Sequence, residues 1–88
     1  DLHIDEGGVR SFLSALDGVE AVHDLHIWGM STTESALTAH LVMPSGYPGD
    51  DFLRTAAAEL ETRFGIHHAT IQIERDRAAC SLPNRHGP

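Results

Sequence analysis

The 88-residue sequence is about as long as one small folded domain, which excludes a second domain. Hydrophobic residues make up 41% of the chain and charged residues 22%, so we expect a buried core rather than disorder. The formal net charge is -7, and all six basic residues are arginines. This acidic balance argues against a surface that binds nucleic acid or an anionic membrane.

Cys80 is the single cysteine of the sequence, which excludes an internal disulfide and a CxxC motif and fits a reducing compartment. No apolar run approaches the roughly 18 residues of a membrane span, and no signal-peptide pattern is present, so we expect a soluble chain. Histidine is frequent. The seven histidines are His3, His23, His26, His40, His67, His68 and His86.

A first helix is predicted over Glu6–Asp17, where four apolar residues recur at the spacing of one helix face. Asp5 precedes this segment as a candidate N-cap, and Gly18 follows it at the place of a left-handed C-terminal cap. The apolar residues are Val9, Phe12, Leu13 and Leu16.

Two strands are predicted next, because the apolar period changes from about 3.6 to two. The first strand runs from Val19 to Trp28, and the polar residues of 31–34 form the turn after it. The second strand, antiparallel to the first, covers Ala36–Met43. Its expected core side consists of Leu37, Ala39, Leu41 and Met43.

A longer helix and a third strand complete the pattern. The loop Pro44–Gly49 leads to Asp50, a candidate N-cap, and Gly65 closes the helix in the position of a C-terminal cap. The strand Ala69–Arg75 follows. The apolar stripe of the helix consists of Leu53, Ala56, Ala57, Leu60 and Phe64.

This order of elements predicts an α+β fold, an αββαβ open sandwich in which a three-stranded mixed sheet carries both helices on one face. We expect a single domain over residues 1–88, structured from about residue 5 to residue 76, with a tail at 77–88. The opposite face of the sheet is left without helices. It must be solvated, bind a ligand, or pack against another chain.

Histidines and a carboxylate are predicted to share this open face. If Leu25 and Ile27 point toward the helices, the side chains that point away from them, because strand side chains alternate, are Asp24, His26 and Trp28. The same alternation places His40 and Glu74 on the open face.

A register that pairs Trp28 with Thr38 also pairs His26 with His40. Directly opposed residues have Cβ atoms about 4.5 to 5.5 Å apart, which is a chelating distance. Imidazole nitrogen and carboxylate oxygen are zinc ligands, so His26, His40 and Glu74 form a candidate metal site.

Other residues extend the candidate set. His23 has the wrong alternation for the open face unless a bulge turns it, and it stays a candidate ligand. His68 shares the alternation of Glu74, while Asp76 and Cys80 lie just past the third strand. The alternative interpretation is that single histidines are ordinary surface residues, and we accept it for His67, His68 and His86.

No pattern of an enzyme is present. The sequence lacks a glycine-rich phosphate loop, a GxSxG motif and an HExxH motif, and Cys80 has no neighbour that would activate its thiol. We therefore predict that the chain is not an enzyme. Trp28 is either a cover over the sheet or an interface anchor, a role in which tryptophan is enriched.

Three segments carry a resemblance to a known family. The stretches VHDLHIW (22–28), ALTAHLV (36–42) and HATIQIE (68–74), with Gly18 and Val19 before them, resemble the C-terminal cytoplasmic domain of the cation diffusion facilitator family. These are zinc, cadmium and cobalt efflux transporters such as the CzcD-like proteins and the animal zinc transporters. The resemblance covers the chain from about Asp5 to Asp76.

The resemblance implies a cytoplasmic regulatory domain of an integral membrane protein, for which we expect the bacterial inner membrane. It implies a ferredoxin-like fold similar to that of copper metallochaperones, a V-shaped homodimer, and the transmembrane domain of the same transporter as a partner. Divalent cations would bind near the dimer interface and favour the transport-competent arrangement. The implied ligands are His23, His40 and Glu74, with His26 used in some relatives and Asp76 in others.

The chain departs from some relatives, which have a histidine at the position of Glu74 or a multi-cysteine tail around Cys80. The sequence therefore predicts a metal-sensing, dimerising domain that binds Zn²⁺, with Cd²⁺, Co²⁺ or Ni²⁺ as alternative ions. The competing hypotheses are a small-molecule-binding regulatory αβ module and a metal-free dimerisation domain anchored by Trp28. A soluble Cu(I) metallochaperone is disfavoured because a CxxC motif is missing.

Overall fold

The computed structural model describes residues 3–76. The expected tail at 77–88, with Cys80 and His86, lies outside these residues. No helix in the described part of the chain is long and apolar enough to cross a membrane. The elements, in chain order, are α1 (Glu6–Ser14), β1 (Ala21–Gly29), β2 (Ser35–Val42), α2 (Asp50–Phe64) and β3 (His68–Glu74).

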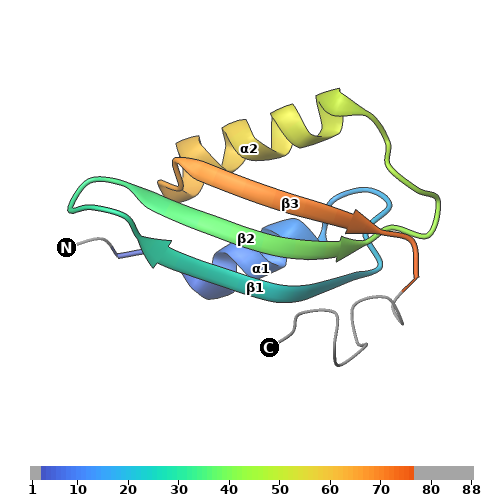
Figure 1. Cartoon of the computed structure of the whole chain (residues 1–88), viewed down its shortest axis with the longest axis horizontal. Coiled ribbons are helices and arrows are strands. Elements are labelled where there is room, and N and C mark those ends of the chain that lie inside the picture. The colour runs from blue at the N-terminus through green and yellow to red at the C-terminus, as the bar shows by residue number, and fades with distance from the viewer. Residues whose placement is uncertain (1–2, 77–88) are drawn as a thin grey trace.

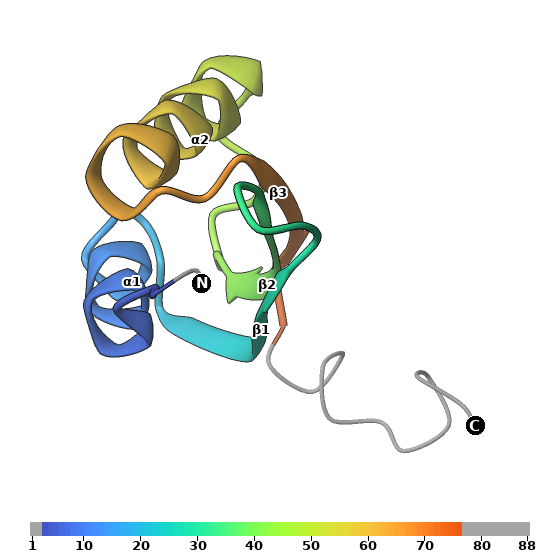
Figure 2. The same ribbon diagram turned by 90° about the vertical axis from the view of Figure 1, so that its left-hand side faces the viewer.

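The three strands form one sheet in the order β1-β2-β3, with β1 antiparallel to β2 and β3 parallel to β2 (Figure 1). Figure 2 shows that both helices lie on one side of this sheet. The α+β class, the αββαβ order and the mixed sheet predicted from the sequence are therefore confirmed. Within residues 3–76 no helix lies over the opposite face of the sheet, and we call it the open face.

The core lies between the helices and the sheet. The apolar residues recur with the period of each helix or strand because one face of each element packs against this core. Of the four apolar residues predicted for the first helix, Val9 and Leu13 are fully buried in the core, and the other two are partly buried and pack against it. In α2 the buried residues are Ala56 and Leu60, whereas Ala57 is exposed and Leu53 lies outside the core cluster. Phe52 packs against the core instead. It stands four residues before Ala56, and residues four apart lie on the same face of a helix.

The start of α1 is capped as expected. The Asp5 side chain accepts a hydrogen bond from the backbone N–H of Gly8 at 2.9 Å. The predicted C-terminus of this helix is wrong: α1 ends at Ser14, with Ala15 as its C-cap. Gly18, at φ +90°, instead belongs to the turn that leads into β1.

The C-terminal cap of α2 agrees with the prediction, whereas the N-cap differs from it. Gly49, at φ +121°, is the N-cap, and Asp50 is the first helical residue rather than the cap. Asp50 and Asp51 still place negative charge in the first turn, where the helix dipole favours it. Gly65 closes the helix in the left-handed conformation at φ +74°, as predicted.

The register predicted for the first two strands is wrong by two residues. Trp28 pairs with Ala36, and His26 pairs with Thr38, because the hairpin loop is closed by the Met30 N–H bonding to the Glu34 carbonyl at 2.8 Å. A shift by an even number of residues leaves every side chain on its expected face but changes its cross-strand neighbours. His26 is therefore not the partner of His40.

Candidate metal centre

A β-bulge in β1 decides which histidine faces His40. The regular pairing with β2 is interrupted between His23 and His26, so that Asp24 and Leu25 together oppose a single residue. Asp24 has φ +53° and is the only non-glycine residue with positive φ among residues 3–76. Because the bulge adds one residue, Val22 and Leu25 both pack against the core, and His23 turns to the open face.

His23 pairs directly with His40 across the two strands. The bulge that was required for His23 to reach the open face is thus present. The Nε2 atom of His23 is buried and has no hydrogen-bond partner within the described part of the chain. A buried polar atom without a partner costs free energy, so this nitrogen favours a ligand that the chain itself does not supply.

His40, in the central strand, has a carboxylate on either side. Its Nδ1 atom lies 3.4 Å from Oδ2 of Asp24 in β1 and 3.4 Å from Oε2 of Glu74 in β3. Glu74 is a buried carboxylate, 7% exposed, and the Gln72 side-chain amide donates a hydrogen bond to its Oε2. The three strands therefore bring two imidazoles and two carboxylates together at one end of the open face.

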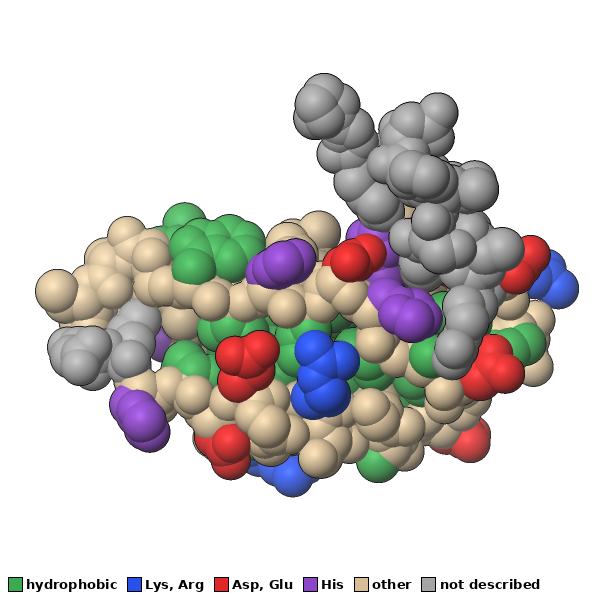
Figure 3. Space-filling model, turned by 90° about the horizontal axis from the view of Figure 1, so that it is seen from below, with side chains coloured by type: hydrophobic (Ala, Val, Ile, Leu, Met, Phe, Trp, Pro, Cys, Tyr) green, Lys and Arg blue, Asp and Glu red, His purple; other side chains and the backbone are tan. Residues whose placement is uncertain are grey.

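The space-filling view shows where histidine and acidic side chains lie. Histidine side chains lie beside an acidic side chain along the upper edge of Figure 3, which is the side of the open face. No group of three or more His, Cys, Asp or Glu side chains in residues 3–76 is arranged so that it could hold a metal ion. The donors are thus collected, but they contact one another rather than surround a common centre.

The remaining sequence candidates lie at other positions of the sheet and its ends. His26 is exposed on the open face opposite Thr38. His68 lies at the other end of β3 from Glu74, with its Nε2 atom 3.0 Å from Oε1 of Glu34. Asp76 is exposed just beyond β3.

Strand alternation placed Asp24 on the open face, but sequence reasoning did not count it among the donors. A signal for it exists in the chain. The core residues Val22, Leu25 and Ile27 are spaced by three and then by two, and the extra residue in the first interval indicates a bulge.

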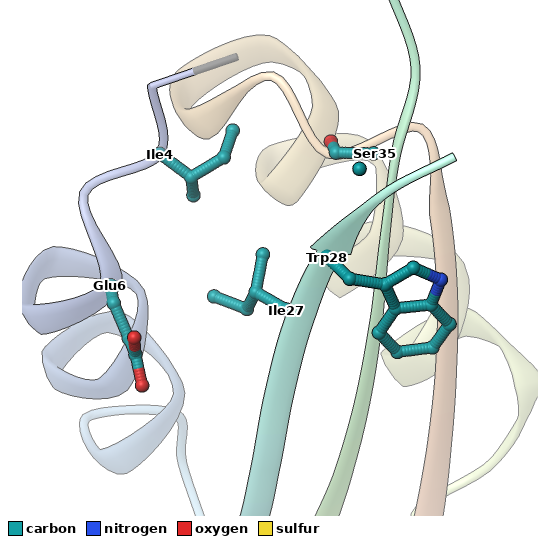
Figure 4. Close-up of a pocket in the computed structure, with 6 residues that line it drawn as sticks. Ile4, Glu6, Ile27, Trp28 and Ser35 are labelled. Carbon is teal, nitrogen blue, oxygen red and sulfur yellow. The ribbon is translucent and has the colours of Figure 1, made fainter. Parts of the chain in front are cut away.

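Two hollows lie elsewhere on the molecule. A cavity of about 170 Å³ is lined by Ile4, Ile27 and Ser35, and in Figure 4 Trp28 lies across β1 from the two isoleucines. It is smaller than the roughly 300 to 1,000 Å³ of typical ligand pockets.

A groove of about 580 Å³ lies between α1 and α2. The Arg63 guanidinium carbon lies 5.0 Å from the centre of the Phe12 ring and 5.3 Å from that of Phe64. The charged residues that line this groove already have partners within the chain. Asp5 caps α1, and Arg63 pairs with Glu59 at 3.4 Å. Neither hollow gathers polar groups as the open face does.

The chain matches the family described as the cytoplasmic domain of cation efflux proteins over residues 3–76, and it belongs to that family. It is also similar to a solved structure, the metal-bound C-terminal domain of the CzcD transporter from Cuprividus metallidurans. The TM-score is 0.71 and the identity 35%, with 81% of this chain and 99% of that chain covered. The resemblance stated from the sequence is confirmed.

Relatives come from animals and plants. The human proton-coupled zinc antiporter SLC30A2 is 34% identical, with 92% of this chain and 23% of that protein covered. The Caenorhabditis elegans zinc transporter ttm-1 is 38% identical, with 82% of this chain and 18% of that protein covered. The chain thus spans about a fifth of the length of these relatives. The family consists of transporter domains, which confirms the prediction that the chain is not an enzyme.

Proposed function

We propose that the chain is the metal-sensing, dimerising cytoplasmic domain of a divalent-cation efflux transporter. The proposed ligands are His23, His40 and Glu74, with His26 as an outer member of the set. The observation that carries the proposal is the direct pairing of His23 with His40, next to the buried Glu74 carboxylate 3.4 Å from His40. Zinc is the proposed ion, with cadmium, cobalt or nickel as alternatives, because nitrogen and oxygen donors discriminate weakly among these ions.

The donor set fits such an ion. Directly opposed strand residues have Cβ atoms about 4.5 to 5.5 Å apart, so the His23 and His40 imidazoles can reach one ion. The buried Nε2 atom of His23 would gain a partner on binding. A cation would also stabilise the charge of the buried Glu74 carboxylate beside His40.

Binding would require a further donor to turn toward the ion, because no three of these side chains in residues 3–76 share one centre. His40 now contacts Asp24 and Glu74 directly, at 3.4 Å in each case. Zinc bonds to nitrogen and oxygen are about 2.0 to 2.2 Å long, so two donors of one tetrahedral zinc lie about 3.3 to 3.6 Å apart. The distance from Nδ1 of His40 to each carboxylate oxygen is therefore already that of two ligands of one ion.

Dimerisation follows from the same electrostatics. Two copies of a chain with a net charge of -7 repel each other, and a dication held at the open face reduces that repulsion. Trp28 is 47% exposed on this face and is a proposed interface anchor. Metal binding would shift a population of paired domains that already exists, and so favour the transport-competent state of the membrane part.

The location is part of the proposal. The relatives are named as zinc transporters, and this chain spans only about a fifth of their length. We therefore place the chain on the cytoplasmic side of an integral membrane protein, with the transmembrane domain of the same transporter as its partner. The membrane that we propose is the bacterial inner membrane.

The test is a calorimetric titration of the metal-free chain with zinc. His40→Ala should weaken zinc binding at least about tenfold, because it removes the central imidazole. The matched control is His67→Ala, an exposed histidine in the loop before β3, which should bind zinc as the unmodified chain does. Scattering measured along the titration should show association into dimers. Absence of zinc binding by the unmodified chain, or equal binding by His40→Ala, would overturn the proposal.

A further inference from the structure

Asp24 reaches the same cluster as its sequence neighbour His23. In a regular strand, consecutive side chains point to opposite faces. Here His23 pairs with His40 on the open face, and the Asp24 carboxylate lies 3.4 Å from Nδ1 of that same His40. One strand therefore delivers two potential donors from adjacent positions.

The backbone at Asp24 is what makes this delivery possible. Its φ of +53° lies in the left-handed region, which residues with a Cβ atom rarely adopt, although aspartate tolerates it better than most. Unfavourable backbone conformations and bulges are concentrated at functional sites, where a bulge re-aims a side chain. A glycine at this position would have been easier to accommodate, so the side chain itself calls for an explanation.

We propose that Asp24 supplies a carboxylate ligand to the ion held by His23, His40 and Glu74. This inference rests on the proposed metal-sensing function and adds a residue to its site. With Asp24 included, the cluster offers two nitrogen and two oxygen donors, the four that tetrahedral zinc takes. The Asp24 side chain is 45% exposed and that of Glu74 is 5% exposed, so one of the two carboxylates beside His40 is open to solvent and the other is buried.

The experiment separates the carboxylate from the backbone. Asp24→Gly and Asp24→Asn both remove the charged group and keep a residue that accepts a left-handed conformation. The control is Glu34→Gln, which removes one negative charge at the hairpin loop, where Glu34 pairs with His68. Zinc affinity is measured by calorimetry, the ligand field by the visible spectrum of the Co²⁺ complex, and the fold by thermal unfolding of the metal-free chains.

The expected result is zinc binding at least about tenfold weaker in both Asp24 variants, with an altered Co²⁺ spectrum. Glu34→Gln should match the unmodified chain, and the metal-free Asp24→Gly chain should unfold at a similar temperature. Zinc binding by Asp24→Gly equal to that of the unmodified chain, or an unchanged Co²⁺ spectrum, overturns the inference and leaves the proposed function intact. Absence of zinc binding by the unmodified chain overturns both.

Discussion

Gly8 packs so closely against Phe64 that a Cβ atom on the glycine would lie 3.1 Å from Cε1 of the ring. The same Cβ atom would lie 2.5 Å from Oδ2 of Asp5, the carboxylate that caps α1. Gly7, next to it, has only Oδ1 of Asp5 within reach, at 3.8 Å. Two adjacent glycines in one helical turn therefore have opposite packing constraints.

The two positions should respond in opposite ways to alanine. Gly7→Ala should raise the free energy of unfolding by about 0.5 to 1 kcal/mol, because alanine has the higher helix propensity. Gly8→Ala should lower it by about 1 kcal/mol, because loss of the Asp5 cap and crowding against Phe64 outweigh that gain. Urea unfolding of the three chains measures the difference. A stabilising effect of Gly8→Ala would show that Asp5 and Phe64 move away from the added methyl group at little cost in free energy.

The fold was largely predictable because its elements follow the apolar periods. The Val9, Phe12, Leu13 and Leu16 stripe of α1 and the alternation in β2 gave the layers and the open face. The register was not predictable, because it depends on the loop closed between Met30 and Glu34. The early end of α1 at Ser14 was missed because the apolar spacing continues to Leu16, which packs against the core from beyond the helix.

The bulge predicts an order of importance among the histidines. His23→Ala should weaken zinc binding more than His26→Ala does, because His23 pairs with His40 and His26 pairs with Thr38. Calorimetric titration with zinc at one pH measures both variants. If His26→Ala proves the more damaging variant, the register seen in the metal-free chain is not the one that binds the ion.

The site was predictable in part. Strand alternation identified His40 and Glu74 as residues of one face, and a bulge was the condition set for His23 to join them. Strand alternation also placed Asp24 on the open face, but its place beside His40 was not predicted, because it depends on the bulge in the pairing of the two strands. The contact between Asp24 and His40 is a tertiary feature that no local pattern encodes.

Zinc binding should weaken in acid. An imidazole must lose its proton to ligate a metal, and histidine ordinarily protonates near about pH 6.5. Zinc affinity at about pH 5.5 should therefore be at least about tenfold lower than at about pH 7.5. Calorimetry in buffers of known protonation enthalpy measures this, with circular dichroism to verify that the metal-free fold persists. Equal affinities at both pH values would mean that histidines do not ligate the ion.

Trp28 gives a direct signal of association, because it is the single tryptophan of the chain and is 47% exposed. Zinc should shift its fluorescence emission to shorter wavelength as a second copy covers it. Trp28→Ala should weaken zinc-dependent dimerisation, measured by sedimentation, while each chain still binds zinc. Emission that stays constant while dimers form would place the interface away from Trp28.

Tyr47 should ionise at unusually high pH. A hydrogen bond from its hydroxyl to Asp50, reinforced by desolvation and by the negative charge of Asp50, raises the pKa of Tyr47 above its ordinary value of 10.0. The folded state then holds the proton more tightly than the unfolded state. This contribution to stability is fully present below pH 10 and is lost as pH rises through the folded pKa.

Asp50→Asn should return the Tyr47 titration toward its ordinary range. The chain has one tyrosine, so the absorbance of tyrosinate reports on this residue alone. The control is Asp51→Asn, at a neighbouring carboxylate that pairs with Arg54. A titration curve that is unchanged in Asp50→Asn would assign the raised pKa to a cause other than this hydrogen bond.

The sheet has two edges that never touch, since β1 and β3 each pair only with β2. An ion coordinated from all three strands would act as a cross-link between segments distant in sequence, and unfolding would have to break it. At a free zinc concentration 100 times the Kd, such a ligand adds about 2.7 kcal/mol to the free energy of unfolding. Such a cross-link would slow amide hydrogen exchange along both outer strands and would also raise the melting temperature.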